Sequence, residues 1–416
     1  MPTPPELISR LLAPRVRAAL ADTPVVLIHG ARQSGKTTLA RMVGEPRGFS
    51  YVSFDDDAVL GAALRDPVGF VADLPERVIL DEVQRVPALF TSLKVAVDRH
   101  RVPGRFILTG SANVLLVPAL ADSLAGRMGI LRLHPFSQCE LAGQEPRFLD
   151  ALFSGQFRTR VVERLGPELA ERIVAGGYPA ALARSEPARR SAWYRDYVGT
   201  EIQRDVRDLS RIRSLDSLPR LLAVAASNTA RLLNITELAG PFQLDRKTIH
   251  DHTILLEGVF LLQRLQPWYT NRLSRLVKTP KLHMGDTGIA CALLGMQAGD
   301  LQRDGGLLGF VLETFVLQEL QRQASGREEP LSFFHFRDRY GYEVDIVIER
   351  GAMSVAGVEV KAAASVTDSD FRGLRKLREA AGDRFVHGVV LYDGTATIPF
   401  GDGFHAVPIR ALWETP

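Results

Sequence analysis

The segment with the clearest chemical meaning fits the pattern G-x-x-x-x-G-K-[ST] and reads Gly30-Ala31-Arg32-Gln33-Ser34-Gly35-Lys36-Thr37. Its two glycines permit a tight turn in which successive backbone N–H groups point inward, and a following helix N-terminus adds partial positive charge. Such a loop cradles nucleotide phosphates: Lys36 reaches the β- and γ-phosphates, and the Thr37 hydroxyl ligates Mg²⁺. The alternative is a glycine turn between strand and helix with a chance lysine.

The neighbouring elements are those that a phosphate cradle needs. The short apolar run 25–28 before the loop is typical of a buried strand, and residues 38–43, opening with Thr38, form a plausible amphipathic helix. Strand, glycine loop and helix in this order predict a nucleotide site. We expect ATP and Mg²⁺ as cofactors, with Thr38 and the loop residues Ala31, Arg32, Gln33 and Ser34 around the phosphates.

Two further apolar runs end in polar residues. Residues 77–80 lead into Asp81 and Glu82, and residues 105–108 lead into Thr109-Gly110-Ser111. Asp81 is expected to hold Mg²⁺, while Glu82 orients or deprotonates the attacking water. Because ligands sit at the carboxyl ends of parallel strands, Thr109 or Ser111 is a candidate to hydrogen-bond the γ-phosphate or the attacking water. A strand-ending turn that merely needs its glycine is an equally good reading of that third run.

Size and composition set the broad class. The chain has 416 residues, 46% hydrophobic and 24% charged, which favours two to four domains of an ordinary globular protein. The net charge of +3 is nearly neutral, so any nucleic-acid binding must come from local patches. Its two cysteines, far apart, and the absence of a signal-like or membrane-length apolar run lead us to expect a cytoplasmic protein without membrane contact.

The middle of the chain has a helix-turn-helix pattern. An apolar helix over 218–233 and a short helix ending at Gly240 precede a helix from Asp245 to about Glu257, and strands near 259–262 and 281–283 would form a wing. The stretch 263–281 has no acidic residue and predicts a phosphate-binding patch with aromatic contacts, made of Arg264, Trp268, Tyr269, Arg272, Arg275, Lys278 and Lys281. Packing of this unit on the nucleotide domain or on a partner protein is an equally good reading.

The last third of the chain contains a possible metal site. Glu313 lies on an apolar helix, Asp345 lies on an alternating strand, and Glu359 and Lys361 share one face of the next strand. Carboxylates that converge with an ammonium make a metal-dependent phosphodiesterase centre: Glu313, Asp345 and Glu359 hold Mg²⁺, and Lys361 positions the nucleophile or stabilises developing charge. The alternative is a structural or DNA-holding role.

The N-terminal motifs together resemble prokaryotic AAA-type ATPases close to the STAND class. The resemblance is carried by the loop, Asp81-Glu82-Val83-Gln84, Thr109-Gly110-Ser111 and Ser123-Leu124-Ala125-Gly126-Arg127. It implies that Arg127 senses the γ-phosphate, within its own chain or on a neighbour, although a structural salt bridge is the competing reading. Gly176-Gly177-Tyr178-Pro179 resembles the turn where the family's helical lid begins, close to the adenine.

The C-terminal set resembles the PD-(D/E)XK fold of restriction endonucleases, with Glu313, Asp345 and Glu359-x-Lys361 as its residues. ATPase, winged-helix and nuclease-like units occur in this order in a family long labelled as of unknown function. The expected fold is α/β: a P-loop parallel sheet (1–175), a helical lid (176–214), a winged helix (215–295) and a restriction-endonuclease-like domain (296–416).

Two functions follow from these units. In the first, ATP binding and hydrolysis control a DNA-interacting winged helix and a metal-dependent nuclease. In the second, the protein is an ATP-gated regulatory or signalling switch with an inert C-terminal domain. Both require ATP binding, and a homo-oligomer is possible in either case.

Overall fold

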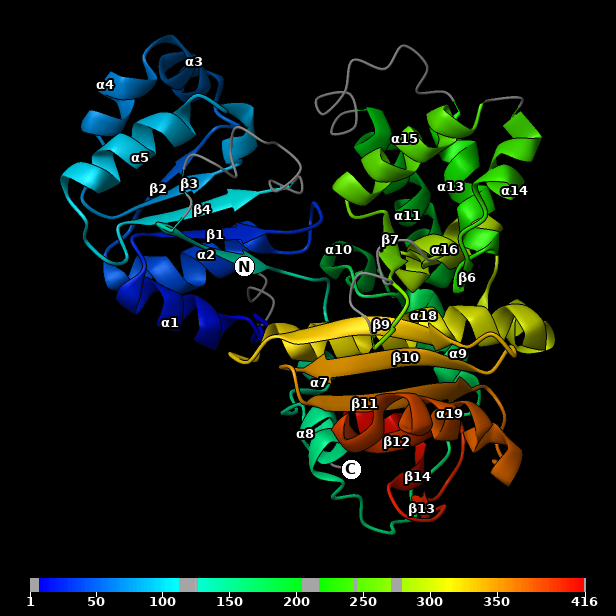
Figure 1. Ribbon diagram of the computed structural model, residues 1–416. Helices are drawn as coiled ribbons and strands as arrows, with labels where there is room; N and C mark the ends of the chain where they lie inside the picture. Colours follow the sequence, from blue (N-terminus) through cyan, green and yellow to red (C-terminus); the bar gives the residue numbers. More distant parts are fainter. Residues whose placement is uncertain are drawn as a thin grey trace.

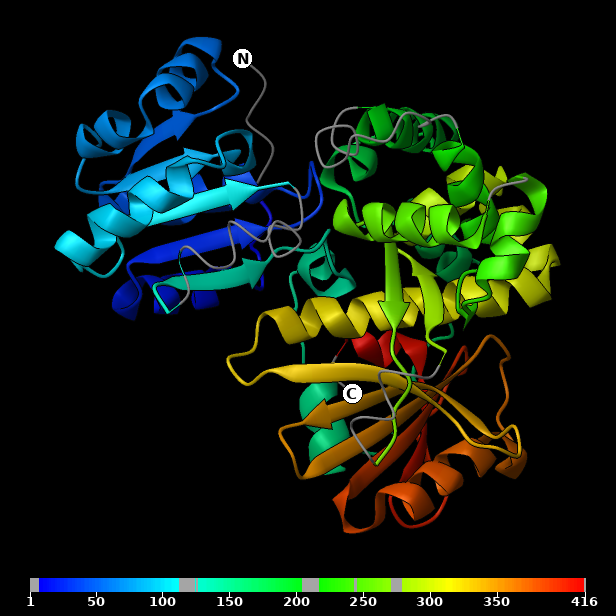
Figure 2. The same ribbon diagram turned by 45° about the horizontal axis from the view of Figure 1, so that its top comes forward.

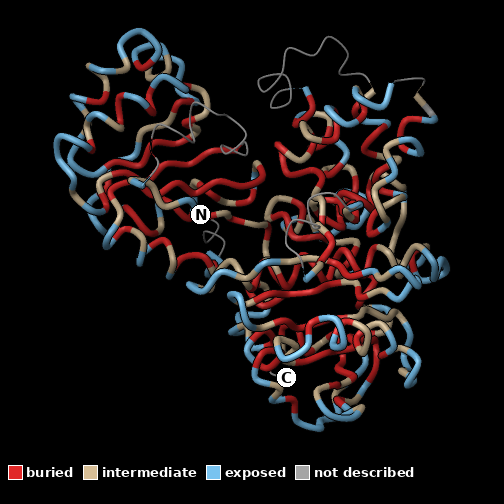
Figure 3. The backbone as a smooth tube through the Cα atoms, in the orientation of Figure 1, coloured by how far each residue is buried: buried red, intermediate tan, exposed pale blue. Residues whose placement is uncertain are grey.

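The computed structural model describes residues 7–111, 124, 126–203, 217–242, 245–270 and 279–414. Three sheets organise the chain: a five-stranded sheet near the N-terminus, a three-stranded sheet in the helical middle region and a six-stranded C-terminal sheet. Figure 1 shows the N-terminal unit beside the middle region, with the C-terminal sheet below them. Buried residues run along the strands of the two larger sheets, as Figure 3 shows.

The N-terminal sheet is parallel and has the order β2-β3-β4-β1-β5. Its strands are β1 (Val25–His29), β2 (Ser50–Ser53), β3 (Val78–Asp81), β4 (Phe106–Gly110) and β5 (Met128–Arg132). Helices cover both faces, so the central strands are apolar throughout. One face packs on α1 (Ala13–Asp22) and α2 (Lys36–Gly44), and the other on α3 (Asp57–Arg65), α4 (Pro67–Ala72) and α5 (Leu89–Arg99).

The segment before the expected boundary at residue 175 packs against the C-terminal sheet. The helices that follow β5 are α7 (Gln138–Ala142), α8 (Phe148–Ser154) and α9 (Pro167–Ala175). Their apolar side chains, including Phe148, Leu152 and Ile173, share one buried cluster with the C-terminal strands. This segment therefore packs with the C-terminal core, although it follows the N-terminal sheet in sequence.

The middle region is mostly helical and contains the small sheet β6-β8-β7. Its elements are α10 (Pro179–Leu182), α11 (Pro187–Glu201), α13 (Leu218–Ser227), β6 (Arg231–Leu232), α14 (Ile235–Ala239), α15 (Arg246–Gly258), β7 (Leu262–Leu265), β8 (Lys281–Met284) and α16 (Thr287–Leu294). The helix expected over 218–233 is shorter, because the chain turns after Ser227 and pairs with β8 as β6. The lid residues 204–214 lie outside the described residues.

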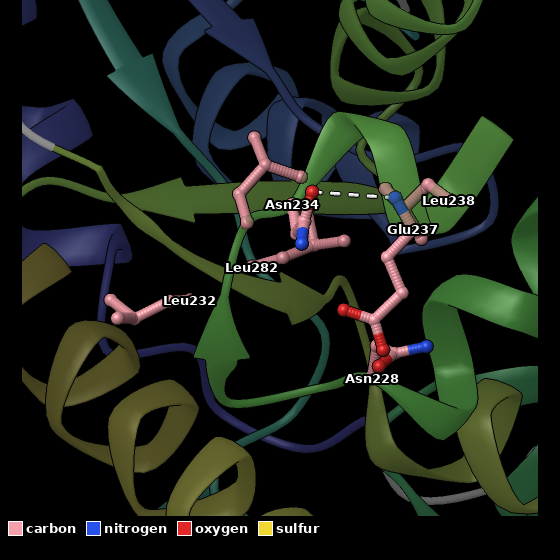
Figure 4. Close-up of a pocket in the computed structure, with 7 residues that line it drawn as sticks. Asn228, Leu232, Asn234, Glu237, Leu238 and Leu282 are labelled. Carbon is pink, nitrogen blue, oxygen red and sulfur yellow. Dashed lines mark hydrogen bonds between the residues drawn. The ribbon is translucent and has the colours of Figure 1, made fainter. Parts of the chain in front are cut away.

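A side-chain cap begins α14. The Asn234 side chain accepts hydrogen bonds from the backbone N–H groups of Thr236 and Glu237, at 3.1 and 3.3 Å. Figure 4 shows the second bond beside a small pocket that Leu232 of β6 and Leu282 of β8 also line. The pocket has a volume of about 10 Å³, room for about one water molecule.

The C-terminal sheet is mixed and has the order β13-β14-β12-β11-β10-β9. Its elements are α17 (Ala298–Arg303), α18 (Gly305–Ser325), β9 (Leu331–Arg337), β10 (Glu343–Arg350), β11 (Ser354–Lys361), α19 (Arg372–Ala381), β12 (Phe385–Tyr392), β13 (Ile398–Pro399) and β14 (Phe404–Pro408). Two buried clusters, one with α18 and one with α19, show that these helices cover opposite faces, and Figure 2 shows α18 lying along its face. Among the described helices, none combines the length and apolarity needed to cross a membrane.

Candidate nucleotide-binding site and C-terminal carboxylate cluster

The glycine loop joins β1 to α2 at the carboxyl edge of the parallel sheet. Gly35 caps α2 in a left-handed conformation (φ 97°), and Gln33 also has a positive φ of 58°. A side chain at Gly30 would meet the Leu133 carbonyl oxygen at 2.1 Å, so the loop lies directly against the end of β5. Positive φ values of this kind are what a phosphate loop needs in order to turn its amide groups toward one point ahead of the helix.

Lys36 is buried and bonds to its own loop. Its Nζ donates to the carbonyl oxygens of Gly30 and Ala31 at 3.0 and 2.9 Å. Both of these partners are backbone carbonyl oxygens of the loop, so the ammonium brings positive charge to the loop. A phosphate group is the kind of ligand that such a charge attracts.

Asp81 is surrounded by hydroxyl groups at the end of β3. Thr37 Oγ1 lies 2.9 and 3.1 Å from its two carboxylate oxygens, Tyr51 OH donates at 2.8 Å, and Thr109 Oγ1 also donates. The Thr37 hydroxyl and the Asp81 carboxylate are oxygen ligands of the type that Mg²⁺ prefers. The chemistry and position of this pair therefore fit a magnesium ion at the phosphate loop.

Glu82 follows Asp81 in a left-handed conformation with φ 59°, which is uncommon for a residue with a side chain. Its backbone N–H donates to Thr109 Oγ1 at 3.2 Å. Gln84 Nε2 donates both to the Glu82 carboxylate and, at 2.9 Å, to Ser111 Oγ. The sequence assigned Ser111 to the nucleotide directly, whereas the structure links it to Glu82 through Gln84.

Arg10 also holds the loop, and the sequence analysis did not single it out. Its Nη1 donates to the Ser34 carbonyl oxygen at 2.8 Å, Nη2 donates to the His134 carbonyl oxygen at 2.6 Å, and Nε pairs with Glu140 at 3.0 Å. This buried guanidinium ties the chain before α1 to the loop and to α7. It belongs to no motif, so no sequence signal identified it.

The lid helix α11 reaches the loop from the middle region. Tyr197 OH donates to the Arg32 carbonyl oxygen at 3.3 Å, and Arg32 Nε lies 4.0 Å from Glu201 Oε1. Tyr178, in the predicted lid turn, packs against Tyr197 with ring centroids 4.9 Å apart and tilted by 53°, and it shares a buried cluster with Ala31. The loop and the lid turn are therefore in contact.

A second contact links the sheet edge to the middle region through Phe260. The Phe260 ring lies 5.8 Å from the His29 ring and 4.8 Å from the Arg132 guanidinium. Burial, Arg132 and Lys36 lower the pKa of His29 to about 4, and burial lowers the pKa of Arg132 to about 10. Among the described residues Arg132 has no carboxylate partner, so it is a second cation beside the loop.

Arg127 lies at the other end of the sheet. It directly precedes β5, and its carbonyl oxygen accepts from the backbone N–H of Val25, the first residue of β1. Its side chain pairs with Asp98 at 2.5 and 3.1 Å. The loop follows the last residue of β1, so the structure does not bring Arg127 to the nucleotide site of its own chain. Ser123 and Ala125 of the same motif lie outside the described residues.

The C-terminal carboxylates do converge, and we call Glu313, Asp345 and Glu359 the carboxylate cluster. Asp345 Oδ2 accepts from the backbone N–H of Val360 at 3.0 Å, which fixes it beside β11. Lys361 Nζ lies 3.5 Å from Glu359 and 3.6 Å from Asp370, as the shared strand face predicts. Burial raises the pKa of Glu313 and that of Glu359 well above the usual range.

An ammonium group from another part of the chain lies in this cluster. Lys281 Nζ is 2.7 Å from Glu313 Oε1 and 3.1 Å from Asp345 Oδ1, and its side chain is 5% exposed. Within the described part of the chain, no group of three or more His, Cys, Asp or Glu side chains is arranged to hold a metal ion. The Mg²⁺ site expected from Glu313, Asp345 and Glu359 therefore does not fit this geometry, because Lys281 already neutralises two of the ligands.

The basic patch expected over 263–281 is also different. Trp268 is fully buried, with Nε1 donating to Glu349 at 2.8 Å, and Arg264 pairs with Glu257 at 2.6 Å. Lys281 is inside the carboxylate cluster. Arg272, Arg275 and Lys278 lie outside the described residues. The described members of the patch thus serve packing and ion pairing within the chain.

Three family models match the chain in succession. Residues 22–142 match an AAA domain, residues 166–300 match a domain of unknown function (DUF8612), and residues 308–412 match another domain of unknown function (DUF4143). The chain thus contains an AAA-type P-loop ATPase domain, for which nucleotide binding with Mg²⁺ is typical, followed by two domains whose function is unknown.

The full-length relatives are uncharacterized. The chain is 29% identical over 406 residues to Rv2008c of Mycobacterium tuberculosis and to Mb2031c of Mycobacterium bovis, covering 97% of this chain and 84% of each relative. A Walker-type ATPase of Pyrococcus abyssi has a TM-score of 0.43 and 15% identity over 69% of this chain and 96% of its own. The RuvB branch migration motor of Thermotoga maritima has a TM-score of 0.29 and 18% identity over 62% and 90%. Both likenesses are too distant to carry a functional argument.

Proposed function

We propose that this protein binds ATP with Mg²⁺, hydrolyses it, and uses the nucleotide state to set the position of its helical middle region. One observation carries the proposal: Thr37, at the end of the glycine loop, is hydrogen-bonded to Asp81, and Glu82 is the next residue after Asp81. In P-loop ATPases a hydroxyl and a carboxylate placed in this way hold the metal, and a neighbouring carboxylate acts on water.

Each residue of the site has a distinct part in this proposal. Lys36 leaves the loop carbonyls and binds the β- and γ-phosphates, while Thr37 and Asp81 hold Mg²⁺, which neutralises the developing charge on the phosphates. Glu82 orients the attacking water, and Gln84 and Ser111 fix the Glu82 carboxylate. Arg132 adds positive charge near the phosphates, because it has no anionic partner among the described residues.

The contacts with the middle region supply the route for the signal. Arg32 of the loop meets Tyr197 of α11, and His29 at the sheet edge meets Phe260. Both contacts involve residues that directly precede or belong to the phosphate loop. We infer that a bound triphosphate changes these contacts and so moves the lid helices relative to the sheet.

The geometry favours the non-nucleolytic form of the switch. The arrangement of α13, α14 and α15 with β6, β7 and β8 supports a winged helix, but Trp268 and Lys281 are turned into the protein. Such a unit is suited to packing between the ATPase and C-terminal domains. In the C-terminal domain the cluster expected to hold Mg²⁺ is neutralised by Lys281. DNA contact and nuclease activity are the second candidate function.

Two assays test this proposal. ATP hydrolysis should require Lys36, so Lys36→Ala should abolish both ATP binding and turnover, whereas Lys94→Ala on α5 should leave them unchanged. Plasmid DNA incubated with Mg²⁺ or Mn²⁺, with and without ATP, should remain intact with the wild type and with Asp345→Ala alike. Absence of ATP binding at millimolar concentration would contradict the ATPase proposal, and nicking lost in Asp345→Ala would restore the nuclease.

A further inference from the structure

Phe136 is a point at which all three matched regions of the chain meet. It follows β5, within the region 22–142 that matches an AAA domain. Its backbone N–H donates to the Gly177 carbonyl oxygen at 2.8 Å, and its carbonyl oxygen accepts from Arg322 Nη1 at 2.9 Å. Gly177 belongs to the lid turn in the region 166–300, and Arg322 lies on α18 in the region 308–412. The backbone of one residue therefore links the ATPase domain to both domains of unknown function.

Arg10 connects Phe136 to the phosphate loop. The guanidinium carbon of Arg10 lies 4.6 Å from the centre of the Phe136 ring, which is a cation–π contact. The same guanidinium donates to the carbonyl oxygen of Ser34 in the loop and to that of His134, two residues before Phe136. A side chain on Gly35 would come within 3.3 Å of its Nη1. One planar group thus holds the loop and the segment after β5 in a fixed relation.

Arg322 is itself anchored by two buried carboxylates. It is 3% exposed, and it donates to Glu319 at 2.8 Å and to Asp286 at 3.0 Å. Glu319 also accepts from the backbone N–H of Gln138 on α7 at 2.7 Å, and Asp286 accepts from the backbone N–H of Gly177 at 3.0 Å. Moving the guanidinium would leave buried charges without partners, so its position beside Phe136 is fixed.

These contacts explain the glycine pair at the start of the lid. A side chain on Gly177 would lie 2.6 Å from the Phe136 carbonyl oxygen and 3.0 Å from Arg322 Nη1. A side chain on Gly176, where φ is 64°, would lie 2.2 Å from Asp286 Oδ1. The sequence showed only that a loop ends at this pair. The structure shows that the two glycines let the lid turn pack directly on the Phe136–Arg322 contact.

Another arginine joins the N-terminal unit to α18 without touching the loop. Arg15 of α1 donates to the Ser325 carbonyl oxygen at 3.0 Å, about one turn beyond Arg322, and Figure 2 shows α18, in yellow, reaching toward the N-terminal unit. In the described part of the chain, Arg15 has no hydrogen bond to the phosphate loop or to Phe136. It therefore offers a comparison for the effect of loosening this interface in general.

We propose that Arg10 and Arg322 are positioning residues of the nucleotide site, and that the C-terminal domain acts through Phe136 to hold the phosphate loop in the form that binds ATP. Arg322 fixes Phe136, Phe136 places Arg10, and Arg10 fixes the loop at Ser34. The inference rests on the proposed ATP binding. It adds a part for the C-terminal domain in that binding, separate from the lid contacts described above.

Calorimetric titration of the full-length protein with ATP and Mg²⁺ tests this. Arg10→Met should raise the Kd for ATP about tenfold and Arg322→Met about fivefold, because hydrogen bonds that hold the loop or its support are lost. The hydrolysis rate at saturating ATP should stay within about twofold of wild type, since Glu82 is untouched. Arg15→Met, the matched control, should bind ATP as the wild type does. A purely structural role would lower the unfolding temperature and leave the Kd of the folded variants unchanged.

A double variant tests whether the two arginines act in one chain of contacts. Arg10→Met/Arg322→Met should bind ATP no more weakly than Arg10→Met, whereas independent effects would multiply to about fiftyfold. Where Arg322→Met does not unfold cooperatively, Arg322→Met/Glu319→Gln removes one charge of each sign and should show the same fivefold loss.

Unchanged ATP affinity in the folded Arg322 variants, an equal loss in Arg15→Met or a multiplied loss in the double variant would overturn the inference while leaving the ATPase proposal intact. A wild type that binds no ATP would overturn both.

Discussion

The N-terminal site and the carboxylate cluster each contain a buried lysine near a strand-borne aspartate, but the lysine has different partners in the two places. Lys36 donates to two neutral carbonyl oxygens, and Asp81 accepts from neutral hydroxyls. Lys281 donates to two carboxylates in a buried ion pair. The contacts of the first arrangement are with carbonyl and hydroxyl dipoles, while those of the second join opposite charges within the chain.

This difference has an energetic meaning. Exchanging a neutral hydrogen bond for a phosphate or a metal ion costs about 1 kcal/mol, which charge-assisted bonds to the ligand exceed. Breaking a buried ion pair by removing one partner costs about 3–5 kcal/mol, because an uncompensated charge remains. We therefore expect the same residue types to make a ligand site at the N-terminal sheet and a structural contact between the middle region and the C-terminal sheet.

The largest expected effect concerns the catalytic carboxylate of the N-terminal site. Glu82→Gln should retain ATP binding and lower the rate of hydrolysis by about 10²–10⁴-fold, since only the group that acts on water is removed. Nucleotide binding by calorimetry and phosphate release under saturating ATP separate the two properties. Equal turnover in Glu82→Gln and wild type would remove Glu82 from this role.

The second prediction compares Lys281 of the middle region with Lys361 of the C-terminal domain. Lys281→Met should lower the free energy of unfolding by about 3–5 kcal/mol, because two buried carboxylates lose their counter-charge. Lys361→Met should cost less than about 1 kcal/mol, since Lys361 is 35% exposed and its ion pairs are weak. Urea unfolding of both variants measures the contrast, and equal losses would show that Lys281 is no more tightly paired than Lys361.

These two sites also show what the sequence could and could not predict. The loop lies at the carboxyl end of β1, and Asp81 and Glu82 lie at the carboxyl end of β3, so two local motifs were enough to predict their positions. Lys281 lies 32 and 64 residues from its carboxylate partners, and its own neighbours in sequence suggested an exposed basic patch. Only the packing of β8 against the C-terminal sheet reveals the pairing.

The helix predicted around Glu313 and the strands predicted around Asp345 and Glu359 are present as α18, β10 and β11, for a similar reason. Asp345, Glu359 and Lys361 lie on alternating strands whose period fixes the face of each side chain. The burial of Trp268 was harder to predict from the sequence. Nothing in its local pattern shows that the segment after β7 continues beside β9 and buries the indole. Arg10 reaches Ser34 from outside any motif.

A smaller effect should appear when the pH is lowered. His29 has a pKa of about 4 in the folded protein and about 6.5 when unfolded, so the unfolded state binds more protons between these values. Stability is therefore fully present above pH 6.5 and is lost as the pH falls toward 4, by about 3 kcal/mol for this group. Unfolding curves of wild type and His29→Gln at pH 4.5 and 7 test this, and parallel losses in the two proteins would exclude His29 as the cause.

The smallest expected effect concerns the two arginines that flank β5. Arg127→Ala should change ATP hydrolysis by less than about twofold in the monomer, because Arg127 forms a partly exposed pair with Asp98 away from the loop. Arg132→Ala should weaken ATP binding about tenfold through loss of one charge-assisted contact. Titration with ATP distinguishes them, and the reverse order of effects would place Arg127 at the nucleotide.

The most direct test of this contrast is the number of divalent cations that the wild-type protein binds. In a Mn²⁺ titration followed by electron paramagnetic resonance, a non-hydrolysable ATP analogue should create one tight site per chain. Asp81→Asn should remove that site and Asp345→Asn should leave it intact. A second tight site that depends on Asp345, with or without nucleotide, would contradict the claim that only the N-terminal site is open to a ligand.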